Sequence, residues 1–293
     1  MPQNILGKIA LGSAQFGLDY GINNKRGKIP KEEVFALLRL AASAGIKTLD
    51  TAYAYGKSEK VIGDFLTTHN KQFQVVSKLP PVNPEEVEDV FQRSLDRLNL
   101  GDIYGYLVHD FNWFKKNLGI WSILEKLKKQ KKIKKIGFSL YYPDELEYLL
   151  SKNVRFDLIQ VPYSILDRRF EKLLPELLSK NIEVHARSVF LQGLIFKSPD
   201  KLPGFFSEVK QKLIDLREYC AKKSLSLLEI SLNFVLGNKF IDKVILGVDG
   251  INHLKEIIAA AKHFSRVKDF IPEFRKFSIA DEKILVPSKW PTK

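Results

Sequence analysis

Short apolar runs alternate along the chain with longer segments whose apolar residues recur at helical spacing. Most of the runs are apolar nearly throughout, as in Val244-Ile245-Leu246. Continuous apolar runs of this length are typical of parallel strands that are buried on both faces. The pattern predicts eight strands, over residues 9–12, 47–50, 73–78, 103–109, 136–139, 158–160, 183–187 and 243–247.

The segments between these runs have the features of amphipathic helices. One of them places its apolar residues at the i, i+3, i+4, i+7, i+8 spacing of a single buried face (Val34, Leu37, Leu38, Ala41 and Ala42). In another, Asn83 can cap a helix, Pro84 can occupy the first helical position, and the apolar side extends to Leu98. Residues 205–237 have room for two helices.

Alternating strands and helices indicate an α/β fold with a parallel sheet. Eight strand–helix units in 293 residues match a (β/α)8 barrel, which takes ~250 residues before loops are added. A doubly wound open sheet is the alternative, but it needs a GxGxxG phosphate turn after its first strand, which residues 11–17 lack. The sequence therefore predicts one (β/α)8 TIM-barrel domain over residues 1–293, with a C-terminal tail from about residue 265.

Composition narrows the class of protein. Apolar residues make up 45% of the chain and charged residues 28%, as in a globular protein with a substantial core. Cys220 is the only cysteine, so the chain fits a reducing compartment. No window approaches the ~18 uninterrupted apolar residues of a membrane span, and residues 1–4 have no basic region of a secretory signal. We expect a cytoplasmic protein without a membrane partner.

The charge is unusual, with 47 Lys and Arg against 34 Asp and Glu, a formal +13. Such an excess can indicate nucleic acid or phosphorylated ligands. Much of it lies in residues 126–135, which follow a helical apolar face. Lysines at a helix C-terminus complement its dipole, and no aromatic residues interleave this run as base stacking requires. We interpret the run as a solvated helix end and expect no nucleic-acid partner.

Polar side chains stand at the ends of the predicted strands. In a (β/α)8 barrel the active site lies at the C-terminal ends of the strands. Six consecutive strands, from the second to the seventh, end in a polar residue: Asp50, Lys78, His109, Ser139, Gln160 and Arg187. These side chains are expected to converge on one rim of the barrel.

Four residues near that rim suit the reduction of a carbonyl group. A carbonyl that receives a hydride needs a proton, which Tyr55 can supply, although a free phenol has a pKa of ~10. An ammonium nearby favours the phenolate and lowers that pKa, so Lys78 is expected to act on Tyr55 while Asp50 holds Lys78 by an ion pair. His109 can hydrogen-bond the substrate oxygen. Tyr53, two residues before Tyr55, is the one competitor for the role of acid.

The sequence resembles the aldo-keto reductases over residues 9–261. The resemblance rests on Leu-Asp-Thr-Ala-Tyr-Ala-Tyr-Gly at 49–56, then Ser58-Glu59 and Gly63, Lys78, His109, Gly-Phe-Ser at 137–139 and Gln-Val-Pro-Tyr at 160–163. It implies an NAD(P)H-dependent carbonyl reductase with Tyr55 as general acid and a small-molecule substrate, acting as a monomer. It also places Ser139 and Gln160 at the cofactor carboxamide, and assigns the adenosine side to residues 247–257, where Gly247, His253 and Glu256 are expected contacts.

The chain departs from the family pattern at the cofactor. Leu140 stands where an Asn usually helps to hold the carboxamide. Arg187 replaces an aromatic residue that often stacks on the nicotinamide, although a guanidinium plane can also stack on a ring. In residues 247–257, Asp249 and His253 occupy the positions where an Arg or Lys would indicate NADP. NADPH is the expected cofactor, with NADH as the alternative.

Other interpretations concern residues outside this set. The alternative function is a barrel that keeps the fold but serves as a catalytically silent binding or regulatory subunit. The intact set of four residues argues against it.

His69 and His185 are interpreted as ordinary residues, and no metal site is expected because no group of residues has the spacing of metal ligands. Substrate specificity is assigned to loops with an aromatic wall formed by Phe16, Tyr20, Phe111, Trp113, Phe190 and Phe196.

Overall fold

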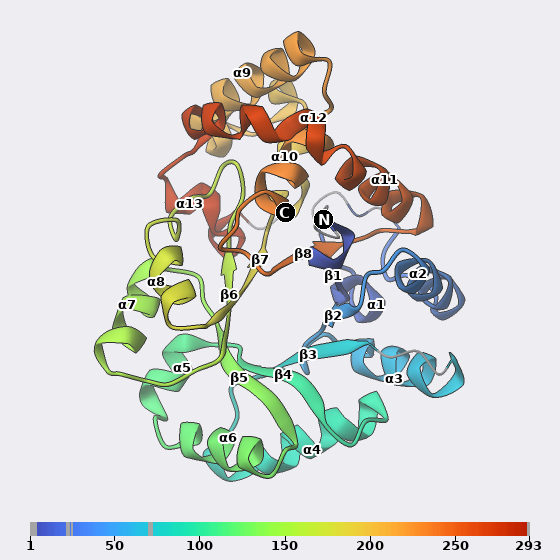
Figure 1. Ribbon diagram of the computed structural model, residues 1–293, viewed down its shortest axis with the longest axis vertical. Coiled ribbons are helices and arrows are strands. Elements are labelled where there is room, and N and C mark those ends of the chain that lie inside the picture. Colours follow the sequence, from blue (N-terminus) through green and yellow to red (C-terminus); the bar gives the residue numbers. More distant parts are fainter. Residues whose placement is uncertain (1–4, 22–23, 25, 70–72, 292–293) are drawn as a thin grey trace.

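The computed structural model describes residues 5–21, 24, 26–69 and 73–291. Residues 1–4, in which no secretory signal was found, and residues 22 and 23, near Tyr20 in a loop to which substrate specificity was assigned, lie outside the described residues. Eight parallel strands close into a barrel in which every strand pairs with its neighbours in sequence order, and β8 pairs with β1 (Figure 1). Helices surround the barrel in Figure 1. The predicted (β/α)8 fold is confirmed.

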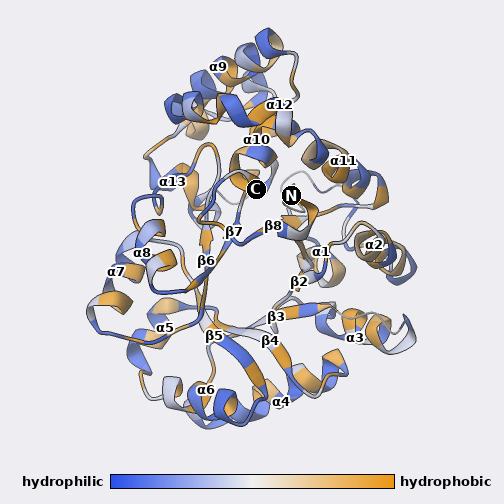
Figure 2. Cartoon of the chain, viewed as in Figure 1, coloured by the Kyte–Doolittle hydropathy of each residue, from blue (hydrophilic) through white to orange (hydrophobic). Residues whose placement is uncertain are grey.

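All eight predicted runs form strands. Their bounds are β1 (Ile9–Gly12), β2 (Thr48–Asp50), β3 (Gln74–Leu79), β4 (Ile103–Val108), β5 (Ile133–Ser139), β6 (Leu158–Pro162), β7 (Glu183–Arg187) and β8 (Lys243–Gly247). Nearly every residue of β1, β2, β3 and β6 is buried, because the helices cover one face of the sheet and the barrel interior the other. In Figure 2, the strands β3, β4 and β6 show the orange of hydrophobic residues.

The α-helices follow the apolar periodicity of the sequence. They are α1 (Ala14–Gly17), α2 (Lys31–Ser43), α3 (Ser58–His69), α4 (Val87–Leu98), α5 (Phe111–Lys116), α6 (Ile120–Lys129), α7 (Pro143–Ser151), α8 (Leu174–Ser179), α9 (Ser207–Lys223), α10 (Leu227–Leu236), α11 (Ile251–Lys262), α12 (Phe264–Val267) and α13 (Glu282–Leu285). In α2, Val34, Leu37, Leu38 and Ala41 are buried as predicted. Asn83 forms a capping box with Glu86 before α4.

The lysine run has a different structure from the one expected. Its first part ends α6, but the chain then enters β5 at Ile133, so Lys134 and Lys135 belong to a strand. Lys128 pairs with Asp157, and Lys135 pairs with Glu183 of β7. The interpretation as a solvated helix end was therefore wrong for this second part, because the strand begins three residues earlier than the apolar pattern indicated.

The segment after α11 packs onto the barrel's outer helices. It contains α12, a 3-10 helical stretch (Lys268–Phe277) and α13. Phe274 and Phe277 are buried, and Phe274 contacts the rings of Tyr219 in α9 and Phe234 in α10. In Figure 1 this red segment lies beside α9 and α10. Among the described residues, no helix has both the length and the apolarity to cross a lipid bilayer.

Candidate active site

A cavity of about 360 Å³ opens at the C-terminal ends of the strands. It is bordered by residues of β1, β2, β5, β6, β7 and β8 and by loops that follow the strands. Eight of the ten residues expected from the sequence line this cavity: Asp50, Tyr55, His109, Ser139, Gln160, Arg187, Gly247 and His253. Lys78 lies beneath its surface with 1% of its area exposed, and Glu256 lies outside it.

Lys78 and Asp50 form a buried ion pair under the cavity floor. Lys78 Nζ donates to both carboxylate oxygens of Asp50, at 2.9 and 2.8 Å, and to the backbone oxygen of Thr51 at 2.8 Å. These three contacts use all the protons of the ammonium group. Gln160 Nε2 also donates to Asp50 Oδ1, at 2.8 Å, so the side chain expected at the cofactor carboxamide also contacts the ion pair.

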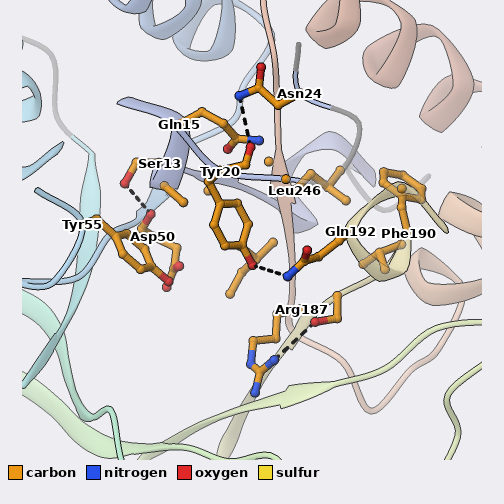
Figure 3. A pocket seen from close by; sticks show the side chains of 18 of the residues that line it. Ser13, Gln15, Tyr20, Asn24, Asp50, Tyr55, Arg187, Phe190, Gln192 and Leu246 are labelled. Carbon is orange, nitrogen blue, oxygen red and sulfur yellow. Dashed lines mark hydrogen bonds between the residues drawn. The ribbon is translucent and has the colours of Figure 1, made fainter. Parts of the chain in front are cut away.

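Tyr55 lies above this pair, and Asp50 lies close to it in Figure 3. Lys78 Nζ lies 5.1 Å from the centre of the Tyr55 ring. Burial is the largest effect on Tyr55 and raises its pKa well above the usual value; Asp50 raises it further, whereas Arg187 opposes the shift. The pKa of Tyr55 is therefore shifted upward, opposite to the direction expected, and the charge of Arg187 opposes the rise.

His109 lies beside the Tyr55 ring in the cavity lining. The two ring centres are 6.1 Å apart, with planes at 80°. Burial, together with the charges of Lys78 and Arg187, lowers the pKa of His109 to about 3. The imidazole is therefore neutral at physiological pH and can hydrogen-bond a substrate oxygen without carrying charge.

Buried hydroxyl groups fix the chain that leads from Asp50 to Tyr55. Ser13 Oγ donates to the backbone oxygen of Asp50 at 2.8 Å. Ser58 Oγ lies 2.7 Å from Ser13 Oγ and 3.0 Å from Thr51 Oγ1. Because Ser13, Thr51 and Ser58 are all fully buried, each hydroxyl needs such a partner. This network joins the loop after β1 to the loop after β2.

Other residues of the 49–63 motif have structural roles. Glu59 is buried, accepts a hydrogen bond from Ser77 Oγ at 2.7 Å and pairs with Arg97. A Cβ on Gly63 would lie 2.2 Å from the backbone oxygen of Arg97, so the residue allows α3 to approach the end of α4. Tyr53 lies under the Arg97 guanidinium, 4.1 Å from it, and outside the cavity lining. Tyr55 is therefore the better placed of the two tyrosines.

The wall opposite Tyr55 is formed by β5, β6 and β7. Ser139 and Gln160 are register partners on β5 and β6. Arg187, at the end of β7, stacks its guanidinium 4.0 Å from the centre of the Tyr141 ring and donates to the backbone oxygen of Leu140 at 2.8 Å. Leu140 is fully buried, so only its backbone takes part in the site.

The adenosine-side residues lie at the end of β8 and the start of α11. Asp249 accepts a hydrogen bond from Gln15 Nε2 at 3.1 Å, and its backbone nitrogen donates to His253 Nδ1 at 3.3 Å. Arg26 donates to the backbone oxygen of Asp249 at 2.9 Å. Glu256 lines a second hollow, which shares His253 and Phe196 with the first cavity.

The aromatic wall is only partly as expected. Tyr20, Phe190 and Phe196 line the cavity, whereas Phe16 and Phe111 are buried in the core. Trp113 donates its indole proton to the backbone oxygen of Val82 instead. Loop position alone cannot distinguish a wall residue from a core residue, since both are apolar.

The cavity lining also includes residues that the sequence did not single out, among them Gln15, Tyr141 and Gln192. Gln192 Nε2 lies 3.2 Å from Tyr20 Oη, and this contact joins two loops over the cavity in Figure 3. Ser188, Leu191 and Gln192 have φ values of 59°, 45° and 50°, so this loop holds several non-glycine residues in the left-handed region. Clusters of residues with unfavourable backbone conformations are found at functional sites. No pattern in the sequence predicts where such conformations occur.

Comparison with known proteins agrees with this geometry. A family model described as "Aldo/keto reductase family" matches residues 8–279. The chain is 28% identical over 258 residues to the oxidoreductase YqkF of Bacillus subtilis strain 168, covering 79% of this chain and 83% of that protein. It is 26% identical to the NADH-specific methylglyoxal reductase of Escherichia coli strain K12, over 75% of this chain and 80% of that protein.

Two further similarities extend over most of the chain. The D-threo-aldose 1-dehydrogenase of a Pseudomonas species is 27% identical, over 81% of this chain and 87% of that protein. The solved structure of the aldo-keto reductase AKR11C1 from Bacillus halodurans, in its holo form, superimposes with a TM-score of 0.74 at 20% identity, covering 94% of each chain. With a family match over nearly its whole length, the chain belongs to the aldo/keto reductase family.

Proposed function

We propose that this protein is an NAD(P)H-dependent oxidoreductase that reduces an aldehyde, ketone or sugar carbonyl to an alcohol. Its family and its oxidoreductase relatives support an oxidoreductase in general terms. The more specific proposal, carbonyl reduction, rests on the pairing of a proton donor with a neutral ring that can form a hydrogen bond. Tyr55 and the uncharged His109 face one cavity above the buried Lys78–Asp50 pair.

Each of these residues has a distinct role. Because the pKa of Tyr55 is raised, its hydroxyl is protonated at physiological pH and can donate to a carbonyl oxygen as negative charge develops there. His109 holds and orients that oxygen. The Lys78–Asp50 pair fixes the floor on which the Tyr55 ring lies, so Tyr55 is positioned before the substrate binds.

The cavity residues suit a nicotinamide cofactor, which would supply the hydride. Arg187 Nε is buried and has no hydrogen-bond partner among the described residues, so a donor remains for a bound group. Arg187, Ser139 and Gln160 would hold the nicotinamide end. Gly247, His253 and Glu256 would hold the adenosine end, where two adjoining hollows provide space.

NADPH is the proposed cofactor, with a weak preference over NADH. Asp249 lines the cavity on the adenosine side, and a carboxylate there opposes a 2′-phosphate. NADH is the alternative, since a relative from Escherichia coli is named as NADH-specific.

The proposed setting is the cytoplasm, where the protein acts as a monomer on small molecules without nucleic acid. Cys220 is unpaired and buried, and burial raises the pKa of its thiol to about 11, so it is an unreactive packing residue. This use of cysteine suits a reducing compartment.

The direct test is oxidation of NADPH and NADH, in parallel, with a panel of aldehydes, ketones and sugars. The expected result is turnover with at least one class of carbonyl, and its loss in Tyr55→Phe. Binding of either cofactor without turnover across the panel would instead favour the silent-subunit alternative.

A further inference from the structure

Six helices of the described chain, α2, α4, α6, α7, α8 and α9, are followed by the same kind of turn. In each turn a residue with positive φ donates its N–H to the carbonyl three residues back, and the next residue donates to the carbonyl five residues back. This pair of hydrogen bonds is the Schellman motif. The residues with positive φ are Gly45, Asn99, Lys131, Asn153, Asn181 and Ser224. All but the last of these turns lead into strands, so they lie at the N-terminal end of the barrel.

The Schellman motif favours particular residue types at two positions. Glycine and asparagine are preferred at the positive φ, because a longer side chain is strained there. An apolar residue is preferred at the next position, because it packs back on the helix. Five of the six turns have Gly, Asn or Ser at the first position and an apolar residue at the second. These apolar residues are Ile46, Leu100, Val154, Ile182 and Leu225.

The turn between α6 and β5 departs from the motif at both positions. Lys131 has the positive φ, 60°, and Lys132 follows where the other turns have an apolar residue; both side chains are exposed. Neither lysine helps the turn to form, because Lys131 is strained and Lys132 buries no apolar surface. The dipole of α6 is already complemented by the lysines of its last turn, at 126, 128 and 129. Local rules broken without a local gain indicate a function for the two charges.

The two lysines belong to a cluster of cations on the turns before β5 and β6 and at the start of β5. Six exposed side chains there form no ion pair within the described chain, and we call them the basic patch: Lys129, Lys131, Lys132, Lys134, Lys152 and Arg155. The two segments are neighbours, since the backbone nitrogen of Asp157 donates to the backbone oxygen of Ile136 at 2.9 Å. Because the active-site cavity opens at the C-terminal ends of the strands, the basic patch lies at the opposite end of the barrel.

The basic patch is bounded on both sides. The turn before β4, residues 99–102, has no cation and contributes Asp102. On the side of β7, Lys180 lies 3.7 Å from the Glu176 carboxylate. A ligand that fits these charges is therefore short, whereas a nucleic-acid backbone would continue past them in both directions.

The side chains of the basic patch also limit the kind of ligand. Among the described residues, no exposed large apolar or aromatic side chain lies on its two turns. Bases therefore have no ring to stack on, and a membrane surface has no apolar anchor to take up. Five of the six cations are lysines, which lack the planar fork with which arginine binds phosphate. Flexible point charges of this kind suit carboxylates that hold no fixed geometry.

We propose that the basic patch is a docking surface for an acidic segment of a partner protein, a short run of Asp and Glu side chains. This proposal goes beyond the proposed function and does not depend on it. A second copy of this chain does not fit, because two molecules with a formal charge of +13 repel each other. A segment docked at this end of the barrel leaves the active-site cavity open.

The test variant restores the Schellman motif. Lys131→Asn with Lys132→Val gives the turn the residues of its neighbour, Asn153 and Val154. The probe is a fluorescein-labelled oligoglutamate peptide, and its Kd is measured by fluorescence anisotropy at low and at physiological salt. We expect the wild type to bind the peptide more weakly as salt increases, and the variant to bind it roughly three- to tenfold more weakly than the wild type. We also expect the variant to unfold at a higher urea concentration, because the strain at Lys131 is relieved.

Lys116→Gln with Lys222→Gln is the matched control. It removes the same charge from two exposed lysines that lie on other parts of the surface and form no ion pair within the described chain. Its Kd for the peptide should stay within roughly twofold of the wild-type value, because its cations lie far from the basic patch. The control therefore distinguishes a localised surface from a general effect of net charge.

The remaining outcomes would overturn the proposal. Absence of peptide binding by the wild type at low salt, or an equal loss of binding in the control, would show that the patch is no docking surface. A lower urea midpoint in Lys131→Asn with Lys132→Val would show that the lysines serve the fold. Tighter binding of a DNA duplex or of phosphatidylserine vesicles than of the peptide, weakened in the same variant, would assign the patch to nucleic acid or to a membrane. Carbonyl turnover should be the same in all these variants and tests the proposed function separately.

Discussion

Gly17 and Tyr55 meet at a distance that only glycine permits. A Cβ on Gly17 would lie 1.8 Å from the backbone oxygen of Tyr55 and 2.6 Å from the backbone nitrogen of Ser58. The end of α1 therefore packs directly on the turn that carries the proposed proton donor. Since no side chain fits between these two segments, Gly17 determines where the Tyr55 ring stands over Lys78.

Gly17→Ala should displace this turn and lower kcat more than tenfold, since misplacement of a catalytic group by ~1 Å can cost 10²-fold in rate. The added methyl should also destabilise the fold by about 1–3 kcal/mol. Gly119→Ala is the control, because a Cβ there meets nothing within 4 Å and the backbone is already helical. Steady-state kinetics and chemical denaturation of both variants check the prediction. Wild-type kcat in Gly17→Ala would show that the turn can move without consequence.

Tyr55→Phe should lower kcat by about 10²–10⁴, the usual contribution of general acid catalysis. The fold and cofactor affinity should be unchanged, since only the hydroxyl is removed. Tyr53→Phe provides the comparison because that ring is covered by Arg97 outside the cavity. Turnover of both variants on one good substrate is the measurement. If Tyr53→Phe lost more activity than Tyr55→Phe, the assignment of the acid would be reversed.

Lys78→Met leaves the Asp50 carboxylate buried without its cation. Removing one partner of a buried pair typically costs about 3–5 kcal/mol, so we expect a loss of this size in the free energy of unfolding. Lys126→Met breaks the exposed pair with Glu88 and should cost less than about 1 kcal/mol. Urea denaturation of the two variants measures the difference. Equal losses would mean that solvent reaches Asp50 in the folded protein.

The barrel and the rim residues could be predicted from the sequence because strand ends are visible as the last residues of apolar runs. Asp50, Ser139 and Arg187 each end a strand as expected, whereas β3 and β6 continue past Lys78 and Gln160, and β4 ends one residue before His109. The electrostatics could not be predicted in the same way. The pKa of Tyr55 depends on how close the charges of Asp50, Lys78 and Arg187 lie to its hydroxyl. Those distances are set by the packing of different strands.

Contacts between segments that are distant in the sequence could not be predicted either. Gly17 is only one glycine in a loop until Tyr55 is seen against it. Phe16 and Phe190 look alike as loop aromatics, yet one is core and the other lines the cavity. Apolar character predicts burial, but which loop side chains face a cavity is decided by packing between loops.

His109 should make the fold sensitive to acid. In the unfolded chain a histidine has a pKa of ~6.5, whereas in the folded protein that of His109 is lowered to about 3. As pH falls from about 6.5 towards 3, the unfolded state binds a proton that the folded state does not, so stability decreases by up to ~1.4 kcal/mol per pH unit. His109→Gln should remove this contribution. Unfolding free energies at pH 7 and pH 5 test it, and parallel losses in both proteins would contradict it.

The preference between NADPH and NADH should be less than tenfold in Kd, which corresponds to under ~1.4 kcal/mol. Arg26 is a cation on this side of the cavity, since it donates to the backbone oxygen of Asp249. Both terminal nitrogens of its guanidinium also donate to the Glu33 carboxylate, which offsets its charge. Asp249 adds a partly exposed carboxylate that opposes the phosphate.

Asp249→Asn should therefore increase the preference for NADPH. Glu33→Gln should also increase it, because it leaves the Arg26 guanidinium without its carboxylate partner. Fluorescence titration of both reduced cofactors at physiological salt measures these ratios, since salt screens weaker long-range attraction beyond ~8–10 Å. A wild-type preference of a hundredfold or more would show that a cation such as Lys255 reaches the phosphate, and that Asp249 does not face it.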